Sequence, residues 1–371
     1  MVLKRLCVFL GVIIFICGFS MWGEAFSAGV PKANLATLSR GVSIYGWFNG
    51  IPEIYELNHF QTCITQKDIS QIKAAGYTHI RLPIEPTFLI GDNISPELKQ
   101  DRLKELDKGV QMILSEGLGV IIDIHPLEAG DFKLQLFKNQ SVQDDLVGLW
   151  ADLASRYSNL PTQKVFFEPL NEPHFQLFDP QKGPTCWYAL QNRIIETIRK
   201  QAPHNTIIVA GYDWGTMYAW LQRNALPYQN LVYSFHFYEP MEFTHQGAPW
   251  VDDLPIREMH SIPYPPNPEG CKLALADSSA HSASRVNQYC AEYKPQEIVQ
   301  KFSLIHTWAQ HQHVPLYLGE FGVYRFYAPP SDRARWLADI KATAQKMDIP
   351  WAVWDYNTTF AVFPTTSAKQ D

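Results

Sequence analysis

The sequence predicts an α/β protein whose eight parallel strands close into a (β/α)8 barrel, a TIM barrel, as a single domain. Short apolar runs rich in β-branched residues alternate with longer segments of helical periodicity, as in a parallel sheet covered by helices. Eight such repeats within 371 residues suit a barrel better than a doubly wound sheet. No G-x-G-x-x-G follows a strand, which disfavours a dinucleotide-binding fold.

The predicted elements follow one another in regular order. Strands are predicted at residues 41–48, 78–82, 119–124, 164–167, 206–210, 231–237, 314–318 and 350–354. Helices are predicted between most of them, at residues 67–75, 101–116, 142–157, 188–201, 295–310 and 331–346. Glycine and proline mark the joins between these elements.

Two regions depart from this regular spacing. Residues 239–294 form one long connection after the sixth strand, and connections of this length are usually functional or disordered. After the eighth strand no clear amphipathic segment follows, so we expect the eighth helix to be short or absent. In that case residues 30–40 could cover the resulting gap.

The first 28 residues have the pattern of a secretory signal peptide. Lys4 and Arg5 precede an apolar run at residues 8–19, and the small residues within 25–28 suit a cleavage site. We therefore expect a mature domain of residues 29–371 that is secreted or periplasmic and keeps no stable membrane association. The alternative is an uncleaved signal anchor, because the apolar run is only slightly short for a membrane span.

Four cysteines would remain after cleavage: Cys63, Cys186, Cys271 and Cys290. An exported protein can pair them, and three connectivities are possible. Cys271 and Cys290 bracket one long loop and are the best candidates for a disulfide. No C-x-x-C spacing occurs, which argues against a zinc site.

The overall charge argues against a nucleic-acid partner. The net charge is −6, whereas nucleic-acid binding would require a basic stripe. Aromatic residues make up 13% of the chain. These rings could simply fill a large core, or some of them could face a groove and stack on sugars, and composition leaves both roles open.

Polar side chains gather where the predicted strands end. In a (β/α)8 barrel the active site lies at these carboxyl ends. Glu172 follows the fourth strand and Glu320 ends the seventh, so the two carboxyls would face each other across the barrel mouth. Such a pair is what hydrolysis of a glycosidic bond requires, with one carboxyl protonated and the other ionised. The other strand ends carry Arg81, His125, Asp213, Trp214, His236, Tyr238, Trp354 and Asp355.

In these motifs the sequence resembles glycoside hydrolase family 5, over residues 41–354. The residues that carry the resemblance are, in chain order, Arg81, His125, Asn171-Glu172-Pro173, His236-Phe237-Tyr238, Gly319-Glu320-Phe321-Gly322 and Trp354. The resemblance implies a retaining glycosidase in which Glu172 is the general acid/base and Glu320 the nucleophile. It implies no metal and no organic cofactor.

The resemblance also implies roles for the surrounding side chains. Arg81 and Tyr238 would keep Glu320 ionised, because a nearby cation and hydrogen bonds to the charged form lower a carboxyl pKa. Asn171 would hydrogen-bond the sugar 2-hydroxyl. His125 and His236 would line the reactive subsite, and its stacking floor would be Trp354.

Four other residues near the strand ends or in the long connection have weaker assignments. Trp47 and Trp214 could be platforms for substrate, although core packing explains them nearly as well. Trp250, in the long connection, is equally ambiguous. Glu168 is expected to be a polar partner inside the barrel and to take no part in the reaction.

The combined prediction is a monomeric endo-β-1,4-glucanase that hydrolyses cellulose or a soluble relative by double displacement. The resemblance equally covers β-mannanases, β-1,3-glucanases and xyloglucan-active enzymes, and the loops at residues 243–250 and 271–290 would set the specificity. A glycan-binding barrel without turnover is disfavoured by the retained carboxyl pair. A metal-dependent barrel hydrolase is disfavoured because the first strand does not end in His-x-His.

Overall fold

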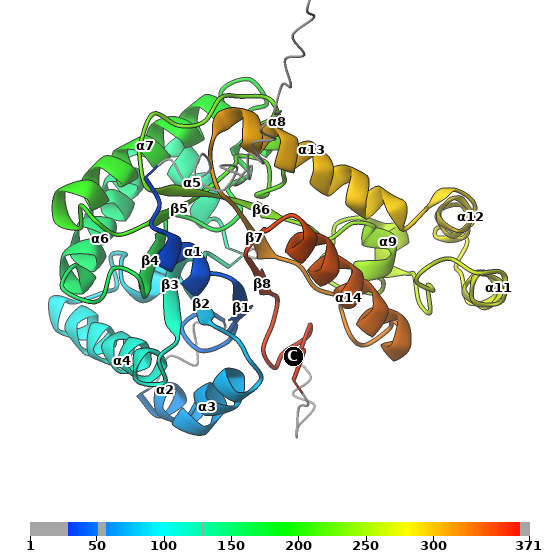
Figure 1. Ribbon diagram of the computed structural model, residues 1–371, viewed down its shortest axis with the longest axis horizontal. Coiled ribbons are helices and arrows are strands. Elements are labelled where there is room, and N and C mark those ends of the chain that lie inside the picture. Colours follow the sequence, from blue (N-terminus) through cyan, green and yellow to red (C-terminus); the bar gives the residue numbers. More distant parts are fainter. Residues whose placement is uncertain (1–28, 51–56, 128–129, 364–371) are drawn as a thin grey trace, which may run out of the picture.

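Eight parallel strands form a closed barrel in sequence order in the computed structural model, which describes residues 29–50, 57–127 and 130–363 (Figure 1). The strands are β1 (Arg40–Ser43), β2 (His79–Ile84), β3 (Gly119–Ile124), β4 (Val165–Glu168), β5 (Ile207–Ala210), β6 (Leu231–His236), β7 (Leu316–Glu320) and β8 (Trp351–Val353). Every predicted strand overlaps one of these. The predicted (β/α)8 barrel is therefore confirmed.

Long helices surround the barrel and match the six predicted ones: α3 (Gln66–Ala74), α4 (Pro96–Ser115), α6 (Gln140–Tyr157), α7 (Gly183–Gln201), α13 (Gln296–Gln312) and α14 (Pro330–Lys346). The local sequence explains where α4 begins. Ser95 accepts a hydrogen bond from the Leu98 N–H at 3.2 Å, and Pro96 occupies the first turn, where a missing N–H costs nothing.

Shorter elements complete the structure at the two ends of the barrel and in its loops. They are α1 (Lys32–Thr37), α2 (Leu57–Thr62), α5 (Phe132–Lys138), α8 (Tyr218–Leu221), α9 (Met241–Thr244), α10 (Leu254–Arg257), α11 (Pro268–Ala276) and α12 (Ala283–Glu292). Two 3-10 turns, η3 (Pro86–Phe88) and η4 (Phe175–Leu177), follow β2 and β4. Most of these elements belong to the loops that build the barrel mouth.

The barrel wall is buried on both of its faces. Along β3, Val120 and Ile122 belong to the outer core beneath the helices, whereas Ile121 between them belongs to a separate cluster. That cluster takes one residue from each of several strands: Phe166, Ile208, Val232, Tyr317 and Ala352. These residues fill the inside of the barrel near the amino ends of the strands.

The N-terminal helix α1 closes this amino-terminal end of the barrel. Val30 and Leu38, on either side of the helix, are buried against the inner cluster. Asn34 is also buried and donates a hydrogen bond from Nδ2 to Thr206 Oγ1 at 2.7 Å. The expectation that residues 30–40 would cover a gap in the helical layer is wrong, because their apolar side chains plug the barrel interior instead.

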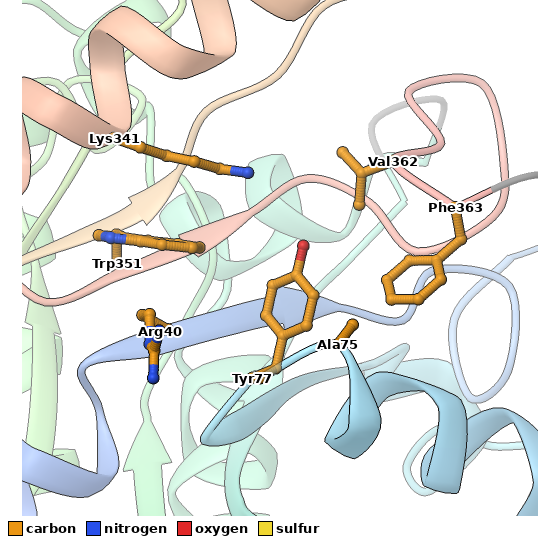
Figure 2. A pocket seen from close by; sticks show the side chains of 8 residues that line it. Arg40, Ala75, Tyr77, Lys341, Trp351, Val362 and Phe363 are labelled. Atoms are coloured by element: carbon orange, nitrogen blue, oxygen red, sulfur yellow. The ribbon is translucent and has the colours of Figure 1, made fainter.

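No helix follows β8 within residues 354–363, as expected. Where an eighth helix would stand, a hollow lies between the end of α3, β8 and α14 (Figure 2). Val362 and Phe363 line one side of it, because the chain turns back and their N–H groups bond to the carbonyls of Asp355 and Tyr356. The returning loop thus covers part of the side of the barrel that an eighth helix would cover.

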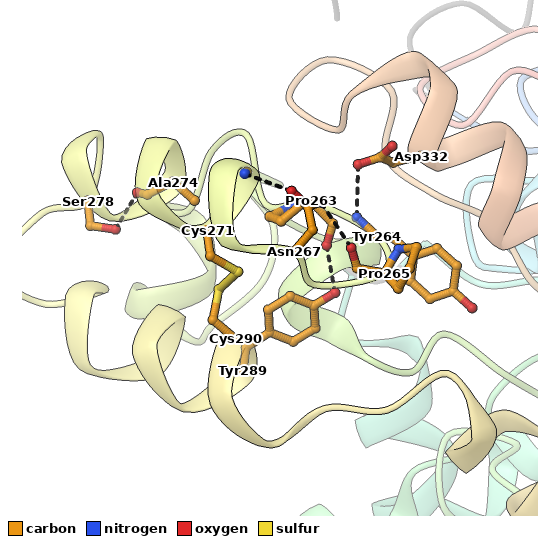
Figure 3. The surroundings of a disulfide bond; sticks show 11 residues. Pro263, Tyr264, Pro265, Asn267, Cys271, Ala274, Ser278, Tyr289, Cys290 and Asp332 are labelled. Atoms are coloured by element: carbon orange, nitrogen blue, oxygen red, sulfur yellow. Dashed lines mark hydrogen bonds between the residues drawn. A yellow bond between two sulfur atoms is a disulfide. The ribbon is translucent and has the colours of Figure 1, made fainter.

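The long connection after β6 is ordered and helical. It contains α9 to α12, and a disulfide between Cys271 and Cys290 joins α11 to α12, as predicted (Figure 3). Tyr264 fastens the connection to α14, since its hydroxyl donates to Asp339 at 2.8 Å and its N–H to Asp332 at 2.9 Å. Residues 239–294 therefore form a fixed structure beside the barrel mouth.

The predicted signal peptide, residues 1–28, lies outside the described residues. Among the helices that the structure describes, none has both the length and the apolar character needed to cross a bilayer.

Removing the disulfide should destabilise the fold. A Cys271→Ala/Cys290→Ala variant frees a loop that is closed over a sequence separation of 19 residues. We expect the free energy of unfolding to fall by about 3 kcal/mol, measured by urea denaturation. Reductant should lower the stability of the wild type toward that of the variant and leave the variant unchanged. A wild-type stability that is insensitive to full reduction would contradict this role.

Candidate active site

Arg81, on β2, lies at the centre of the barrel mouth with no exposed surface. Its guanidinium binds Glu168 through two hydrogen bonds, from Nε at 2.8 Å and Nη2 at 2.9 Å. Nη2 also lies 2.9 Å from the Asp123 carboxylate, and Nη1 donates to Glu320 at 2.5 Å. One cation therefore connects carboxylates from β3, β4 and β7, and the predicted interior role of Glu168 is confirmed.

Glu320 is held by two donors at the end of β7. Oε1 accepts the hydrogen bond from Arg81, and Oε2 accepts one from the Tyr238 hydroxyl at 2.8 Å. His236 Nδ1 lies 3.6 Å from the same Oε2. These three neighbours hold the carboxylate at the end of β7, where one of its oxygens could attack an electrophilic carbon.

Glu172 stands opposite, just beyond β4, with 16% of its side chain exposed. Its backbone has φ 43°, a left-handed conformation that a residue with a side chain rarely adopts and that often occurs at functional positions. Oε1 lies 2.7 Å from His236 Nδ1. A carboxylate oxygen of Glu172 lies within 4.8 Å of one of Glu320, so both can reach one reacting centre.

Glu172 and His236 share a proton. Burial disfavours charge on both groups. Nevertheless the pKa of Glu172 is lowered by its hydrogen bond with His236 and by the imidazole charge. The pKa of His236 is raised from its ordinary 6.5, because the charges of Glu320 and Glu172 outweigh its burial. Over a range of pH the pair therefore binds one proton, which can pass between them along the hydrogen bond.

Asn171 is oriented from two sides. Its Oδ1 accepts a hydrogen bond from Arg81 at 2.8 Å, and its Nδ2 lies 3.1 Å from His125 Nε2. On its other side His125 Nδ1 lies 2.8 Å from Asp123. Burial lowers the pKa of His125 to about 3, so the ring is neutral. It then donates from Nδ1 to Asp123 and accepts from Asn171, which fixes the amide.

Trp354 forms an aromatic floor beside these polar groups. It is half-buried at the end of β8, and its ring stacks on His125 with centroids 5.2 Å apart and planes 14° apart. Tyr45 packs on it at 5.4 Å. The structure thus brings Trp354 together with the polar residues of the mouth, where a sugar ring could lie against it.

Two other predicted platforms have different surroundings. Trp214 is half-buried after β5, with its ring 4.0 Å from that of His174 and the Lys133 ammonium 5.5 Å from its centre. It therefore keeps a surface at the mouth. Trp47 is only 1% exposed, packs against Phe48 and donates from its ring nitrogen to the Phe60 carbonyl. The expectation that Trp47 binds substrate is wrong, because its ring is part of the core.

Asp123 was missed in the sequence as a site residue. It lies within the apolar strand β3, is fully buried, and contacts both Arg81 and His125. Burial raises the pKa of its carboxyl to about 7, against the opposing charge of Arg81. A charged residue inside an otherwise apolar strand, two positions before His125, is the signal that could have identified it.

Glu172, His236 and Glu320 also have the spacing of a three-ligand metal site. Their surroundings do not suit a cation, because Arg81 already binds Glu320 at 2.5 Å and the carboxylate of Glu172 is paired with His236. The arrangement is better explained as two carboxyls with a shared proton. That the protein uses neither metal nor cofactor stays a prediction.

The family model described as Cellulase (glycosyl hydrolase family 5) matches residues 45–359. The chain belongs to glycosyl hydrolase family 5. The matched range contains seven of the eight strands and every residue of the mouth described above, so the likeness extends from the scaffold to the site.

Two curated relatives of this family 5 chain match it over most of their length. Endoglucanase C from Acetivibrio thermocellus is 28% identical over 327 residues, which cover 87% of this chain and 92% of the relative. Cellodextrinase A from Ruminococcus flavefaciens is 28% identical over 333 residues, covering 88% of each. Both names describe enzymes.

Solved structures show the same architecture. The endoglucanase Cel5A from the hyperthermophile Thermotoga maritima superposes with a TM-score of 0.69 at 26% identity, covering 90% of this chain and 94% of that one. Structures of that protein include complexes with cellobiose and with mannotriose. This likeness supports the fold of this family 5 member.

Replacing Arg81 with methionine should destabilise the fold in a pH-dependent way. The change leaves three buried carboxylates without their cation, so we expect a loss of about 3–5 kcal/mol at neutral pH. Burial raises the pKa of Asp123 and Glu168, and the charge of Arg81 opposes that rise. The loss should be smaller at pH 5 than at pH 8, because without the arginine these two carboxyls take up protons at the lower pH. Thermal unfolding at both pH values measures this.

Arg156→Met is the matched control, since its ion pair with Asp107 lies at the protein surface. Its effect should be small, about 0–1 kcal/mol, and similar at both pH values. An Arg81→Met variant with the same loss of stability at pH 5 and pH 8 would refute the proposed charge balance.

Proposed function

We propose that the protein is a retaining endo-β-1,4-glucanase that uses Glu172 as acid/base and Glu320 as nucleophile. The separation of the two carboxylates carries this proposal. Their oxygens approach within 4.8 Å, which suits direct attack by one carboxylate, whereas an inverting enzyme needs roughly 6.5–9.5 Å to admit a water molecule. The names of its full-length relatives support action on β-glucan.

In the first step Glu320 attacks the anomeric carbon of the bound glucan. Its oxygen forms a bond to that carbon while the glycosidic bond breaks, and Glu172 gives its proton to the departing oxygen. His236 can return the shared proton to Glu172 along their 2.7 Å contact, so a proton is available even though the pKa of Glu172 is lowered in the free protein. The product is a glycosyl ester on Glu320.

In the second step water replaces the ester oxygen of Glu320. Glu172, now ionised, takes a proton from the attacking water, and the anomeric carbon returns to the β configuration. Arg81 and Tyr238 stabilise the carboxylate that leaves, because both donate hydrogen bonds to Glu320. Two displacements at one carbon account for retention.

Asn171 and Trp354 position the sugar in this mechanism. The Asn171 amide is fixed by Arg81 and His125, which leaves its remaining N–H free to meet a sugar 2-hydroxyl. Trp354 offers a ring to the apolar face of the same sugar. Since the polar and stacking contacts come from different strands, the pocket can hold a pyranose in one orientation.

A β-mannanase is the second candidate. The observation that favours it is the complex of the Thermotoga maritima relative with mannotriose. Glucose and mannose differ in the orientation of the 2-hydroxyl, which is the group that Asn171 would contact. Product analysis on both polymers distinguishes the two candidates.

We further propose that the protein acts outside the cytoplasm. Residues 1–28 have the pattern of a signal peptide, and the disulfide between Cys271 and Cys290 suits an oxidising compartment. An export signal would also bring the enzyme to its proposed substrate, a soluble polymer outside the cell.

Replacing either carboxylate should abolish hydrolysis of carboxymethylcellulose. Glu320→Gln removes the nucleophile, and we expect kcat/KM to fall by roughly 10⁴-fold or more. Glu172→Gln should lose about 10²–10⁴-fold on the polymer but far less on an aryl cellobioside, whose leaving group needs no proton. Glu97→Gln, on the exposed face of α4, is the control and should have the same activity as the wild type. Both proteins should keep this activity in the presence of a chelator.

Equal activity of wild type and Glu320→Gln would overturn the assignment of the nucleophile. If the wild type releases sugar from mannan and not from glucan, the mechanism stands and the proposed substrate is replaced. Release from neither polymer would favour a glycan-binding barrel without turnover.

The alkaline limb of the pH profile should report the proton shared by Glu172 and His236. The pKa of His236 is raised above 6.5, so the protonated pair persists below that raised pKa and is lost as the pH increases through it. In His236→Gln the limb should move to lower pH, because Glu172 must then hold the proton alone. An alkaline limb that stays at the same pH in the variant would contradict this coupling.

A further inference from the structure

The hollow beside β8 lies on the outside of the barrel, at the end opposite the active site. Arg40 and Trp351 are the first residues of β1 and β8 and pair in register, so their side chains project from neighbouring strands to the same face. Tyr77 precedes β2, Lys341 belongs to α14, and Phe363 lies on the returning loop. We call the space lined by these five residues the side hollow (Figure 2).

The side hollow has the size of a small-molecule site and aromatic walls. Its volume is about 340 Å³, which falls in the range of ligand pockets. The Tyr77 ring meets Trp351 edge-on, with centroids 6.2 Å apart, and lies 5.8 Å from the ring of Phe363. A ligand with a ring of its own would therefore find flat apolar surfaces to pack on.

Three hydrogen-bond donors line the same space. They are the Arg40 guanidinium, the Lys341 ammonium and the Tyr77 hydroxyl. In Figure 2 the polar ends of Lys341 and Tyr77 both lie between Trp351 and Phe363. Within the part of the chain that the structure describes, no group accepts a hydrogen bond from these three side chains, and no carboxylate pairs with either cation. The side hollow thus offers unused donors.

Lys341 lacks a compensating negative charge although it is half-buried. Its ammonium lies 5.3 Å from the centre of the Trp351 ring, a weaker attraction than a carboxylate would supply. Burial lowers the pKa of Lys341, and the positive charge of Arg333 lowers it further. The whole chain has a net charge of −6, so this concentration of cations is local. A bound anion would offset the cost of an unpaired, half-buried charge.

The walls of the side hollow are in place before any ligand binds. The Tyr77 N–H donates to the Ile72 carbonyl at the end of α3, at 3.4 Å, and the Phe363 N–H to the Tyr356 carbonyl at 3.1 Å. Burial raises the pKa of Tyr77 to about 12, so its hydroxyl keeps its proton and can donate. Because these groups are already fixed, binding costs little conformational entropy.

We propose that the side hollow binds a carboxylate attached to a six-membered ring, as in a uronic acid of an acidic glycan. The carboxylate lies between Lys341 and Arg40 and accepts a hydrogen bond from Tyr77, while the ring packs against the aromatic walls. The cations select the anion, and the walls select the ring. Aromatic acids share this chemistry, so the test includes both sources of it.

The test is a ligand-observed NMR titration with glucuronate, benzoate and acetate at constant ionic strength. We expect glucuronate to bind with a dissociation constant of about 1 mM, as for a fragment of this size, and about tenfold more tightly than acetate, which has the charge without the ring. Tighter binding of benzoate than of glucuronate would identify an aromatic acid as the source. Acetate binding as tightly as both, or no binding of any of the three, would overturn the proposal.

Variants of the donors locate the bound anion. Lys341→Met should weaken glucuronate binding about tenfold, because it removes a charge-assisted contact and keeps the length of the side chain. Arg40→Gln should act in the same direction, and Tyr77→Phe, which loses only the hydroxyl, should weaken binding about threefold. Lys346→Met, at the exposed end of α14, is the matched control and should bind as the wild type does. Unchanged binding in the Lys341, Arg40 and Tyr77 variants would refute the site.

Two further measurements separate the side hollow from the active site. Lys341→Met should hydrolyse a neutral aryl cellobioside at the wild-type rate, because the side hollow lies at the other end of the strands. In Glu320→Gln, glucuronate should bind as it does to the wild type, so the result does not depend on the proposed function. Loss of glucuronate binding in Glu320→Gln would show that the anion binds at the barrel mouth and would contradict the proposal.

Discussion

The contacts of Arg81 are the constraint on which the rest of the site depends. From β2 its guanidinium reaches carboxylates on β3, β4 and β7, so one buried cation fixes the relative positions of three strand ends. A buried cation is tolerated only while its donors are used, and buried carboxylates remain ionised only beside it. The contact that prepares Glu320 for attack is therefore also a contact that holds the barrel mouth together, so reactivity and stability cannot be altered separately there.

Much of the fold could be predicted from the sequence because both faces of each strand are buried. Parallel strands covered on both sides are continuous apolar runs, and all eight could be located in this way. The convergence of Glu172, Glu320 and Arg81 was predictable for a related reason, since the ends of parallel strands meet at one edge. These three residues lie far apart in the sequence, but the eight strands close into one barrel, so their ends still meet at one rim.

The errors have physical causes too. A tryptophan after a strand looks the same in the sequence whether its ring faces the mouth or the core. For Trp47 the hydrogen bond from its ring nitrogen to the Phe60 carbonyl shows that the ring lies in the core. Asp123 was missed because its partner Arg81 lies on the neighbouring strand β2, and the spacing of the two residues along the sequence does not show that they meet inside the barrel. The helices α11 and α12 were missed because helices this short are stabilised by tertiary packing and, here, by a disulfide more than by their own periodicity.

The plug formed by α1 gives the molecule two unlike ends. Val30 and Leu38 seal the amino-terminal end of the strands, whereas the polar residues of the candidate active site lie at the opposite end. A solid support, a fusion partner or a surface anchor joined ahead of Gly29 would therefore sit behind the barrel. Immobilised in that orientation, the protein would present its mouth outward, and a long insoluble fibre could lie across it without meeting the point of attachment.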